Sequence, residues 1–222
     1  MPERLPQTAD TTAAVITGGH AFDVPGFHAL FRNFPGVDSY IQHLDNFVAD
    51  VGKVRDQYDV LVFYNMPRED PEGRIKAVLE ALGTTDQGVV LLHHGILSHR
   101  HWAFWDELVG IGDRMADFDF KHGVQLHIDV SNEAHPITAG LDSWDMVDET
   151  YRMNEPGEGC EVLLTVDHPD SMSAIAWTRS FRDSRVFCLQ SGHGNETYAD
   201  PSFRTVLHRG IQWCAGRLEG AG

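Results

Sequence analysis

Residues 88–95 read GVVLLHHG, an apolar run that ends abruptly in two histidines and a glycine. Two similar runs lie upstream, AAVIT at residues 13–17 and DVLVFY at residues 59–64. Continuous apolar runs are typical of strands buried on both faces, because alternation with polar residues disappears where neither face meets water. The three runs therefore predict central strands of a largely parallel sheet in an α/β domain.

Segments of helical period separate these runs. Residues 75–82 place apolar side chains on one helix face, and we expect Asp70 to cap this helix, Pro71 to occupy its first turn and Gly83 to end it. Strict alternation at residues 124–130 indicates a half-buried strand near the sheet edge. The remaining predicted elements are helices at residues 44–51 and 201–214 and strands at residues 37–41, 172–177 and 185–190, the last two joined as a hairpin.

The chain has 222 residues, of which 42% are hydrophobic and 10% aromatic, enough for a domain with a substantial core. Residues 1–222 are expected to form a single domain, with residues 1–12 as a loose N-terminal segment. The 17 Lys and Arg against 33 Asp and Glu give a formal charge of −16, which disfavours nucleic acid and anionic membrane surfaces as partners. No apolar stretch resembles a membrane span or a signal core, so a cytoplasmic location is expected.

The three cysteines are far apart and form no Cys-x-x-Cys pattern, which argues against a disulfide framework and against a thiolate zinc site. Cys188 lies in a predicted strand and Cys214 on the apolar face of a predicted helix, so both are expected in the core. Cys160 lies in an expected loop without a histidine nearby in the sequence. A cysteine-dependent amidase or protease is therefore disfavoured.

Histidines follow three of the predicted strands. His20 comes after the first run, His93 after the third, and His193 after the last predicted strand. Ligands of open α/β sheets bind beyond the carboxyl ends of the strands, and neighbouring strands lie about 4.8 Å apart, so these rings can reach a common point if the strand order allows it. We predict a shared site in which His20, His93, His193 and Glu149 are catalytic. The residues predicted to contact substrate are Gly18, Gly19, Asp23, Asn65, Trp102 and Glu196.

Imidazoles joined by a carboxylate suit zinc or a similar divalent cation, and His20, His93 and His193 are the predicted ligands. Without a metal, the same groups can transfer protons near neutral pH. Gly18–Gly19 does not form the Gly-x-Gly-x-x-Gly fingerprint, so no nucleotide cofactor is expected. Each histidine also has a purely structural interpretation. His93 and His94 would point to opposite faces of an extended chain, so at most one of them is expected to face the site unless the chain bends there.

Several short segments occur in order between residues 13 and 217: TGGH at 17–20 with Asp23, YDVLV at 58–62, GVVLLH at 88–93, HPI at 135–137, DETY at 148–151, GH at 192–193 and GIQWCAG at 210–216. In this ordered set the chain resembles the ThuA-like (trehalose utilisation) family. The resemblance implies a flavodoxin-like three-layer sandwich with a mostly parallel central sheet, similar to class I glutamine amidotransferases, with His93 where those enzymes carry their cysteine. It also implies a link to sugar metabolism.

The expected function is that of a hydrolase, lyase or isomerase acting on a small carbohydrate or an oxidised sugar, with or without a bound divalent metal. The alternative is a non-catalytic sugar-binding or regulatory module on the same fold. A small-molecule carbohydrate is the expected partner. Phe27, Phe31 and Phe34 are interpreted either as a contact between copies in a homo-oligomer or as the buried side of a helix, and Trp102 and Trp105 either as sugar-stacking rings or as core residues.

Overall fold

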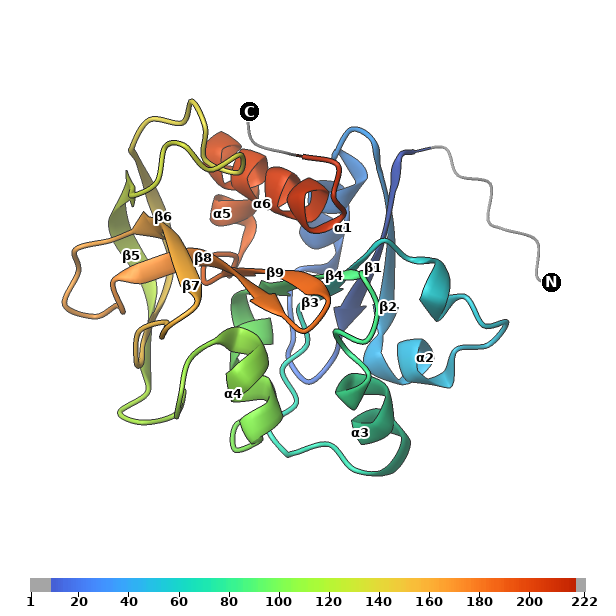
Figure 1. The fold of residues 1–222 in the computed structure, drawn as a ribbon. Coiled ribbons are helices and arrows are strands. Elements are labelled where there is room, and N and C mark those ends of the chain that lie inside the picture. The colour runs from blue at the N-terminus through green and yellow to red at the C-terminus, as the bar shows by residue number, and fades with distance from the viewer. Residues whose placement is uncertain (1–8, 219–222) are drawn as a thin grey trace.

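A computed structural model describes residues 9–218 and contains one nine-stranded sheet (Figure 1). The strands are β1 (Thr11–Thr17), β2 (Val37–His43), β3 (Val60–Phe63), β4 (Gly88–Leu92), β5 (Asp119–Val130), β6 (Trp144–Arg152), β7 (Cys160–Thr165), β8 (Ala174–Phe181) and β9 (Ser184–Leu189). Their order across the sheet is β2-β1-β3-β4-β9-β8-β7-β5-β6. The three continuous apolar runs thus become the neighbouring strands β1, β3 and β4, as predicted, and every residue of these strands is buried.

Helices cover both faces of the sheet. They are α1 (Val24–Arg32), α2 (Leu44–Ala49), α3 (Gly73–Glu80), α4 (Ala103–Val109), α5 (Asn195–Ala199) and α6 (Pro201–Cys214), with short 3₁₀ helices η1 (Arg55–Gln57) and η2 (His93–Leu97). Figure 1 shows α1, α5 and α6 on one face and α2, α3 and α4 on the other. Because successive side chains of a strand point to opposite faces, Val62 packs under the first group and Phe63 under the second.

The sheet has a parallel half and an antiparallel half, which meet at β9. The pairs from β2 through β1, β3 and β4 to β9 are parallel, and the pairs from β9 through β8, β7 and β5 to β6 are antiparallel. The sheet is therefore mixed rather than mostly parallel as predicted. The physical reason is the length of the connections, since β8 and β9 are joined only by Arg182 and Asp183, whereas a parallel crossover needs about a dozen residues.

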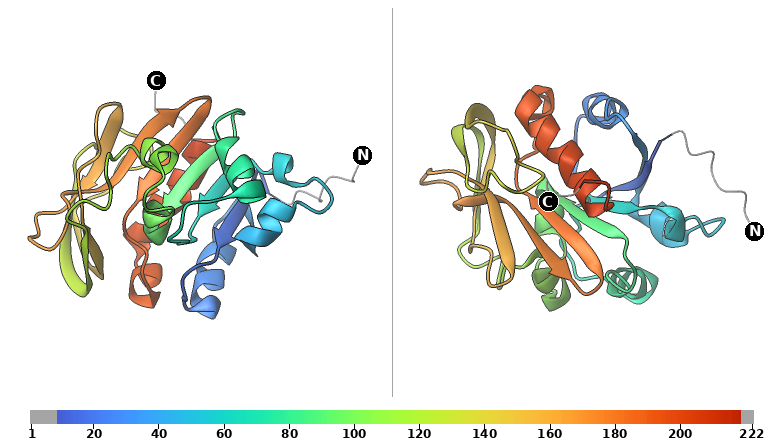
Figure 2. Two further views of the ribbon diagram at one scale, coloured as in Figure 1. Left: turned by 90° about the horizontal axis from the view of Figure 1, so that it is seen from below. Right: turned by 45° about the horizontal axis from the view of Figure 1, so that its top comes forward.

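The antiparallel strands β5 and β6 turn away from the rest of the sheet (Figure 2). β5 pairs with β7 only through Asp129 and Val130, and most of its length pairs with β6. The predicted strand at residues 124–130 is thus the second half of a longer strand next to the sheet edge. This arrangement brings the far end of β6 back toward the carboxyl ends of the parallel strands, where the site lies.

Two expected boundaries differ from the structure. Residues 1–8 of the expected loose segment lie outside the described residues, but Thr11 and Thr12 already belong to β1 and are buried. α3 begins without a side-chain cap, and Asp70 instead accepts a hydrogen bond from the backbone amide of His101 at 3.3 Å. The Asp70 cap was therefore wrong, because this carboxylate holds the neighbouring loop.

The phenylalanines and tryptophans for which the sequence left two roles open mostly belong to the core. Phe27 and Phe31 are buried on α1, and Phe34 is buried just beyond it, so they form the buried side of that helix. Trp105 is fully buried, whereas Trp102 is half-buried at the start of α4. Within residues 9–218, no helix has both the length and the apolar character that a membrane crossing requires.

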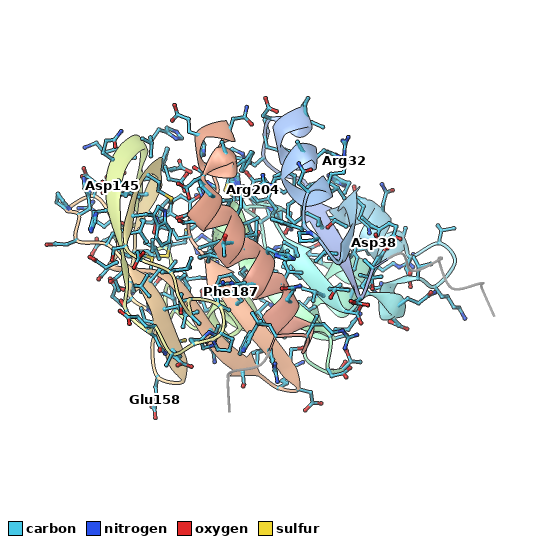
Figure 3. All side chains as sticks on the ribbon, turned by 90° about the horizontal axis from the view of Figure 1, so that it is seen from above. Arg32, Asp38, Asp145, Glu158, Phe187 and Arg204 are labelled. Carbon is cyan, nitrogen blue, oxygen red and sulfur yellow. The ribbon has the colours of Figure 1, made fainter. Side chains whose placement is uncertain are left out.

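A close contact seats α6 on β9. Figure 3 shows Phe187 of β9 beneath this helix, and a Cβ atom at position 210 would lie 2.2 Å from the Phe187 ring. Gly210 is therefore required on the inner face of α6 because only its bare backbone leaves room for the ring.

The loop after η2 is held by Arg114, a fully buried arginine between α4 and β5. Its guanidinium group donates to the backbone carbonyls of Ile96, Ser98 and His99 and to the carboxylate of Asp106, the last at 2.6 Å. The planar fork of five N–H donors allows one side chain to serve all four acceptors. Arg114 therefore fixes the loop that follows the predicted site residues on β4.

Replacing Arg114 by methionine should lower the free energy of unfolding by about 3–5 kcal/mol, because three buried carbonyl groups and a carboxylate lose their donor. Urea denaturation measures this change. Arg74→Met is the matched control, since Arg74 lies exposed on α3 and donates to a single carbonyl, that of Ala49 at 2.9 Å. Similar losses in the two variants would contradict the role assigned to Arg114.

Candidate active site

The predicted strand ends meet at one edge of the sheet. β1, β4 and β9 run in the same direction, and His20, His93 and His193 follow their carboxyl ends. The rings of His93 and His193 lie 5.4 Å apart between centroids. His20 reaches them through His94, whose ring centroid lies 4.1 Å from that of His20 and 4.3 Å from that of His93. The expected gathering of imidazoles is therefore present.

A sharp turn after β4 brings both adjacent histidines into the site. His93 has a φ of 49°, in the left-handed region, so the chain bends instead of continuing as an extended strand. Gly95 permits the bend, because a Cβ atom there would lie 2.1 Å from the carbonyl oxygen of Phe63. The prediction limited the site to one of His93 and His94 only for a chain without a bend, and the bend at His93 is what brings in both.

Glu149, on β6, forms a triangle of close polar atoms with two of the histidines. Its Oε2 lies 2.9 Å from Nε2 of His93 and 3.1 Å from Nδ1 of His193, and these two nitrogens are 3.3 Å apart. His93 is fully buried and Glu149 is 6% exposed. A carboxylate removed from water is tolerated only with such partners. The triangle joins the ends of β4, β6 and β9.

The hydrogens available to this triangle do not satisfy every contact. Nδ1 of His93 lies 2.6 Å from the carbonyl oxygen of Gln190, which only accepts, so Nδ1 carries a proton. In a neutral ring, Nε2 is then an acceptor that faces the acceptor Oε2 of Glu149. Tyr151 lies 3.0 Å from this nitrogen and 3.1 Å from this oxygen, and its single hydroxyl proton serves one of them. An additional proton or a cation is needed between His93 and Glu149.

The electrostatics favour a charged Glu149–His193 pair. Burial opposes ionisation of Glu149, but hydrogen bonds from His193 and His93 outweigh it and hold the pKa of the carboxyl well below its ordinary value. The hydrogen bond with Glu149 raises the pKa of His193, against the opposing effect of its partial burial. Asp148 fixes the His193 loop by accepting from the backbone amides of Gly192 and His193 at 2.8 and 3.0 Å.

Two residues that contact Glu149 escaped the sequence reasoning. Nδ1 of His122 lies 3.1 Å from Oε1 of Glu149, and Tyr151 contacts Oε2. The period of two along β6 could have found Tyr151, because it stands two positions after Glu149 on the same strand face. No pattern indicated His122, which lies in β5 at a register irregularity between Lys121 and Val124.

Two cavities adjoin the triangle, and Glu149 lines both. The first cavity has a volume of about 170 Å³, and its lining includes His20, Arg68, His94, Arg100 and His122. The second cavity has a volume of about 260 Å³, and its lining includes Asp148, His193, Asn195, Glu196 and Thr197. The same carboxylate is thus accessible to ligand groups from two sides.

Of the residues predicted to contact substrate, only Glu196 lines one of these two cavities. Asp23 instead caps α1 by accepting from the backbone amide of Gly26 at 2.6 Å. Asn65 is fully buried after β3, and Trp102 stacks on a neighbouring phenylalanine at 4.7 Å between ring centroids. The structure gives Asp23 and Trp102 structural contacts, and a role for them or Asn65 in substrate binding stays a prediction.

Gly18 and Gly19 hold the end of β1 against the segment after β3. The carbonyl of Gly18 accepts a hydrogen bond from the backbone amide of Met66 at 2.8 Å, and a Cβ atom at position 19 would lie 2.6 Å from the Met66 backbone. Their φ angles of 130° and 76° also favour glycine. These glycines shape the approach to His20 and line neither of the two cavities.

Two sets of side chains have the right atoms for a divalent cation. His122, Glu149 and His193 present one ligand atom each within 4.8 Å of one another, and so do His93, His94 and His193. His20, a predicted ligand, belongs to neither set in the part of the chain that the structure describes. Two imidazoles and one carboxylate with an open position form a donor set known from catalytic zinc sites.

The family model for ThuA, described as trehalose utilisation, matches residues 41–214. The chain belongs to the ThuA family. Membership in the ThuA family points to a role in sugar metabolism. Among curated proteins, no sequence match is found.

Solved structures share the ThuA fold at low sequence identity. A ThuA-like protein from Bacteroides uniformis matches with a TM-score of 0.75 and 20% identity over 96% of this chain and 95% of that one. A ThuA-like protein from Parabacteroides merdae matches with a TM-score of 0.72 and 19% identity over 96% of this chain and 92% of that one. A structure from Thermoplasma acidophilum, described as a GMP synthase subunit, matches with a TM-score of 0.59 and 13% identity over 93% of this chain and 95% of that one. The likeness to class I glutamine amidotransferases that the sequence implied is confirmed at the level of fold.

Replacing Glu149 by glutamine should lower the melting temperature most between about pH 4.5 and 6.5. The lowered pKa of Glu149 means that its contribution is present above the unfolded value of 4.5 and is lost as the pH falls through the folded value. The raised pKa of His193 means that its contribution is complete below the unfolded value of 6.5 and is lost as the pH rises through the folded value.

Thermal melts of both proteins across this range, with EDTA to keep the site free of metal, measure the effect. Glu107→Gln removes an exposed carboxylate from α4 and serves as the control. A melting-temperature difference that stays constant with pH would show that the Glu149–His193 pair is not the source of the stabilisation.

Proposed function

We propose that this protein is an enzyme of sugar metabolism that transfers a proton on a small carbohydrate-derived carbonyl compound, as a lyase or an isomerase. The observation that carries the proposal is the triangle of His93, Glu149 and His193, in which a buried carboxylate lies 2.9 and 3.1 Å from two imidazoles. Glu149 lines both cavities and His193 lines the second, so these two groups of the triangle can meet a ligand, whereas His93 is fully buried behind them. Membership in the ThuA family supports the class of substrate.

His193 is the residue proposed to exchange the proton with the substrate. Its Nδ1 faces Glu149, and its Nε2 has no hydrogen-bond partner within residues 9–218. The side chain is 35% exposed, which leaves this nitrogen open to a ligand. A carboxylate on one ring nitrogen fixes the tautomer and orientation of a histidine and stabilises its charged form, so that the other nitrogen can accept a proton and return it.

The neighbouring groups complete this proposal. Glu149 orients His193, while Tyr151 and the carbonyl of Gln190 hold the ring of His93 in place. His94 is proposed to bind a substrate oxygen, since both of its ring nitrogens are buried without a partner in the described chain. Burial also holds the pKa of His94 far below its ordinary value, so the ring stays neutral and offers one donor and one acceptor.

Two other reaction types fit the geometry less well. Glycoside hydrolysis commonly uses a pair of carboxyl groups that flank the bond, but both oxygens of Asp148 are occupied by backbone amides. Cysteine-based amide transfer needs a reactive thiolate, whereas Cys188 and Cys214 are buried in the core and burial raises the pKa of both thiols. Proton transfer next to a carbonyl requires neither group.

Incubation with a panel of keto-sugars in D₂O should show deuterium incorporation next to the carbonyl group by NMR. His193→Asn should lower this rate by about 10²–10⁴-fold, because the proton-carrying nitrogen is lost. His127→Asn is the control, since His127 is exposed on β5 and pairs with Asp145 at 2.7 Å. A rate that survives in His193→Asn would refute the assignment, and binding of a sugar without any exchange by the wild type would favour the non-catalytic binding module.

We further propose a metal-bound form of the protein in which His122, Glu149 and His193 are the ligands of a divalent cation, in place of the predicted set that contained His20; in that form His193 holds the cation instead of exchanging the proton. The donor set fits, because the three ligand atoms converge and an additional positive charge is needed beside Glu149. When bound, a divalent cation polarises a carbonyl or hydroxyl oxygen of a ligand. The protein side chains hold it and leave both cavities open to that ligand.

Addition of Zn²⁺ to chelator-treated protein should raise the melting temperature and give about one bound ion per chain by elemental analysis. His122→Ala should weaken Zn²⁺ binding by more than about tenfold, because one of three ligands is lost. His127→Ala removes another exposed histidine from β5 and should leave the affinity unchanged. Equal affinities in His122→Ala and the wild type would remove His122 from the ligand set.

A further inference from the structure

We infer that the first cavity binds an anionic group, a carboxylate or a phosphate monoester, and that Arg68 and Arg100 are its contacts. Under the proposed function, the ligand is then an acidic sugar derivative rather than a neutral sugar. The inference rests on the proposed function for the sugar part of the ligand, whereas the anion-binding part rests on the two arginines alone.

Two parallel stretches of backbone bring these arginines to the same cavity. The amide of Arg100 donates to the carbonyl of Arg68 at 3.3 Å, and the amide of His99 donates to the carbonyl of Pro67 at 2.8 Å. The two side chains start from paired positions and both line the first cavity. Arg114 donates to the carbonyl of His99 and so fixes the backbone that carries Arg100.

Neither guanidinium group has a counter-charge in the structure. Among residues 9–218, Arg68 and Arg100 form no ion pair and no side-chain hydrogen bond, and Nε of Arg100 is buried without a partner. Arg114 and Arg217, by contrast, lie beside carboxylates, those of Asp106 and Asp59. Arg68 is exposed to water, whereas Arg100 is half-buried with its Nε unpaired, so the requirement for an acceptor lies at Arg100, and the adjacent Arg68 adds a second positive charge beside it.

The rest of the lining does not meet this requirement. Glu149 is the only carboxylate among the residues that line the first cavity, and its oxygens already lie within 3.1 Å of His93, His122 and His193. The second cavity has the opposite character, with Asp148, Glu149 and Glu196 in its lining and no Lys or Arg. A ligand with an acidic end and a hydroxyl-bearing end therefore has its acidic end in the first cavity.

Calorimetric titration with matched probes tests the inference. D-Gluconate and D-glucose 6-phosphate carry the two anionic groups, and D-glucose is the neutral probe. At least one anionic probe should bind the wild type about tenfold or more tightly than glucose, and added NaCl should weaken that binding. Binding of gluconate alone identifies a carboxylate site, and binding of glucose 6-phosphate alone identifies a phosphate site.

Substitution of the arginines should abolish this preference. Arg100→Gln and Arg68→Gln should each lower the affinity for the anionic probe by about tenfold, since a charge-assisted contact is lost. Arg100→Lys keeps the charge without the planar fork, so its affinity for the anionic probe should lie between that of the two glutamine variants and that of the wild type. Folding is expected to persist, because neither side chain forms an internal bond among the described residues. Arg32→Gln, on α1 and outside the lining of the first cavity, removes one positive charge and should leave binding unchanged.

Equal binding of the anionic and neutral probes, or full retention of the anion preference after both arginine substitutions, would overturn the inference. The proposed function fails separately. Deuterium exchange on neutral keto-sugars without any anion preference would retain the proposed chemistry and remove the anion site. Arginine-dependent anion binding that persists in Glu149→Gln, with no deuterium exchange in the wild type, would retain the anion site and remove the proposed chemistry.

Discussion

The contact between Glu149 and His93 is the constraint on which the rest of the site depends. A carboxylate that is 6% exposed has little water around it, so its charge must be balanced by neighbouring side chains. Those neighbours come from three elements that are distant in the sequence, β4, β6 and the loop after β9. The left-handed turn at His93 places one ring nitrogen beside Oε2 of Glu149. The hydrogen bond from the His193 amide to Asp148 holds the loop that places a second ring nitrogen there. Local backbone geometry and buried charge are therefore coupled at this edge of the sheet.

The two cavities at this edge of the sheet differ in the sign of their charged lining residues, although the net charge of the whole chain is strongly negative. Unpaired arginines line one cavity, and carboxylates line the other. Glu149 belongs to both linings, so a ligand that spans them passes the His193–Glu149 pair. The overall excess of acidic residues is thus not spread evenly, and the local arrangement rather than the total charge decides which ligands are attracted.

Sequence patterns predicted the parallel half of the fold well, because buried parallel strands leave a strong signal. The runs that became β1, β3 and β4 are mainly apolar, and the loops after the carboxyl ends of β1, β4 and β9 carry the histidines that meet in the structure. The antiparallel half was harder to place, since alternation shows that a strand exists but not which strand it pairs with. His122 was missed for this reason, whereas Tyr151 could have been found from its spacing to Glu149 on β6. The sequence could not decide whether His94 joins the site, because that depends on a single left-handed residue, His93, which bends the chain.

The position of β9 in the middle of the sheet has a consequence for biogenesis. β4 ends at Leu92, but its second hydrogen-bonding neighbour does not begin until Ser184, so one edge of β4 stays unpaired while the intervening residues are synthesised. An open apolar strand edge is a template for association with other chains. Long-range pairing of this kind also slows folding, because distant segments must meet before they are stabilised. The nascent chain therefore passes through a stage in which this edge is open, and the histidine-bearing site is completed only after His193, which follows β9, has been synthesised.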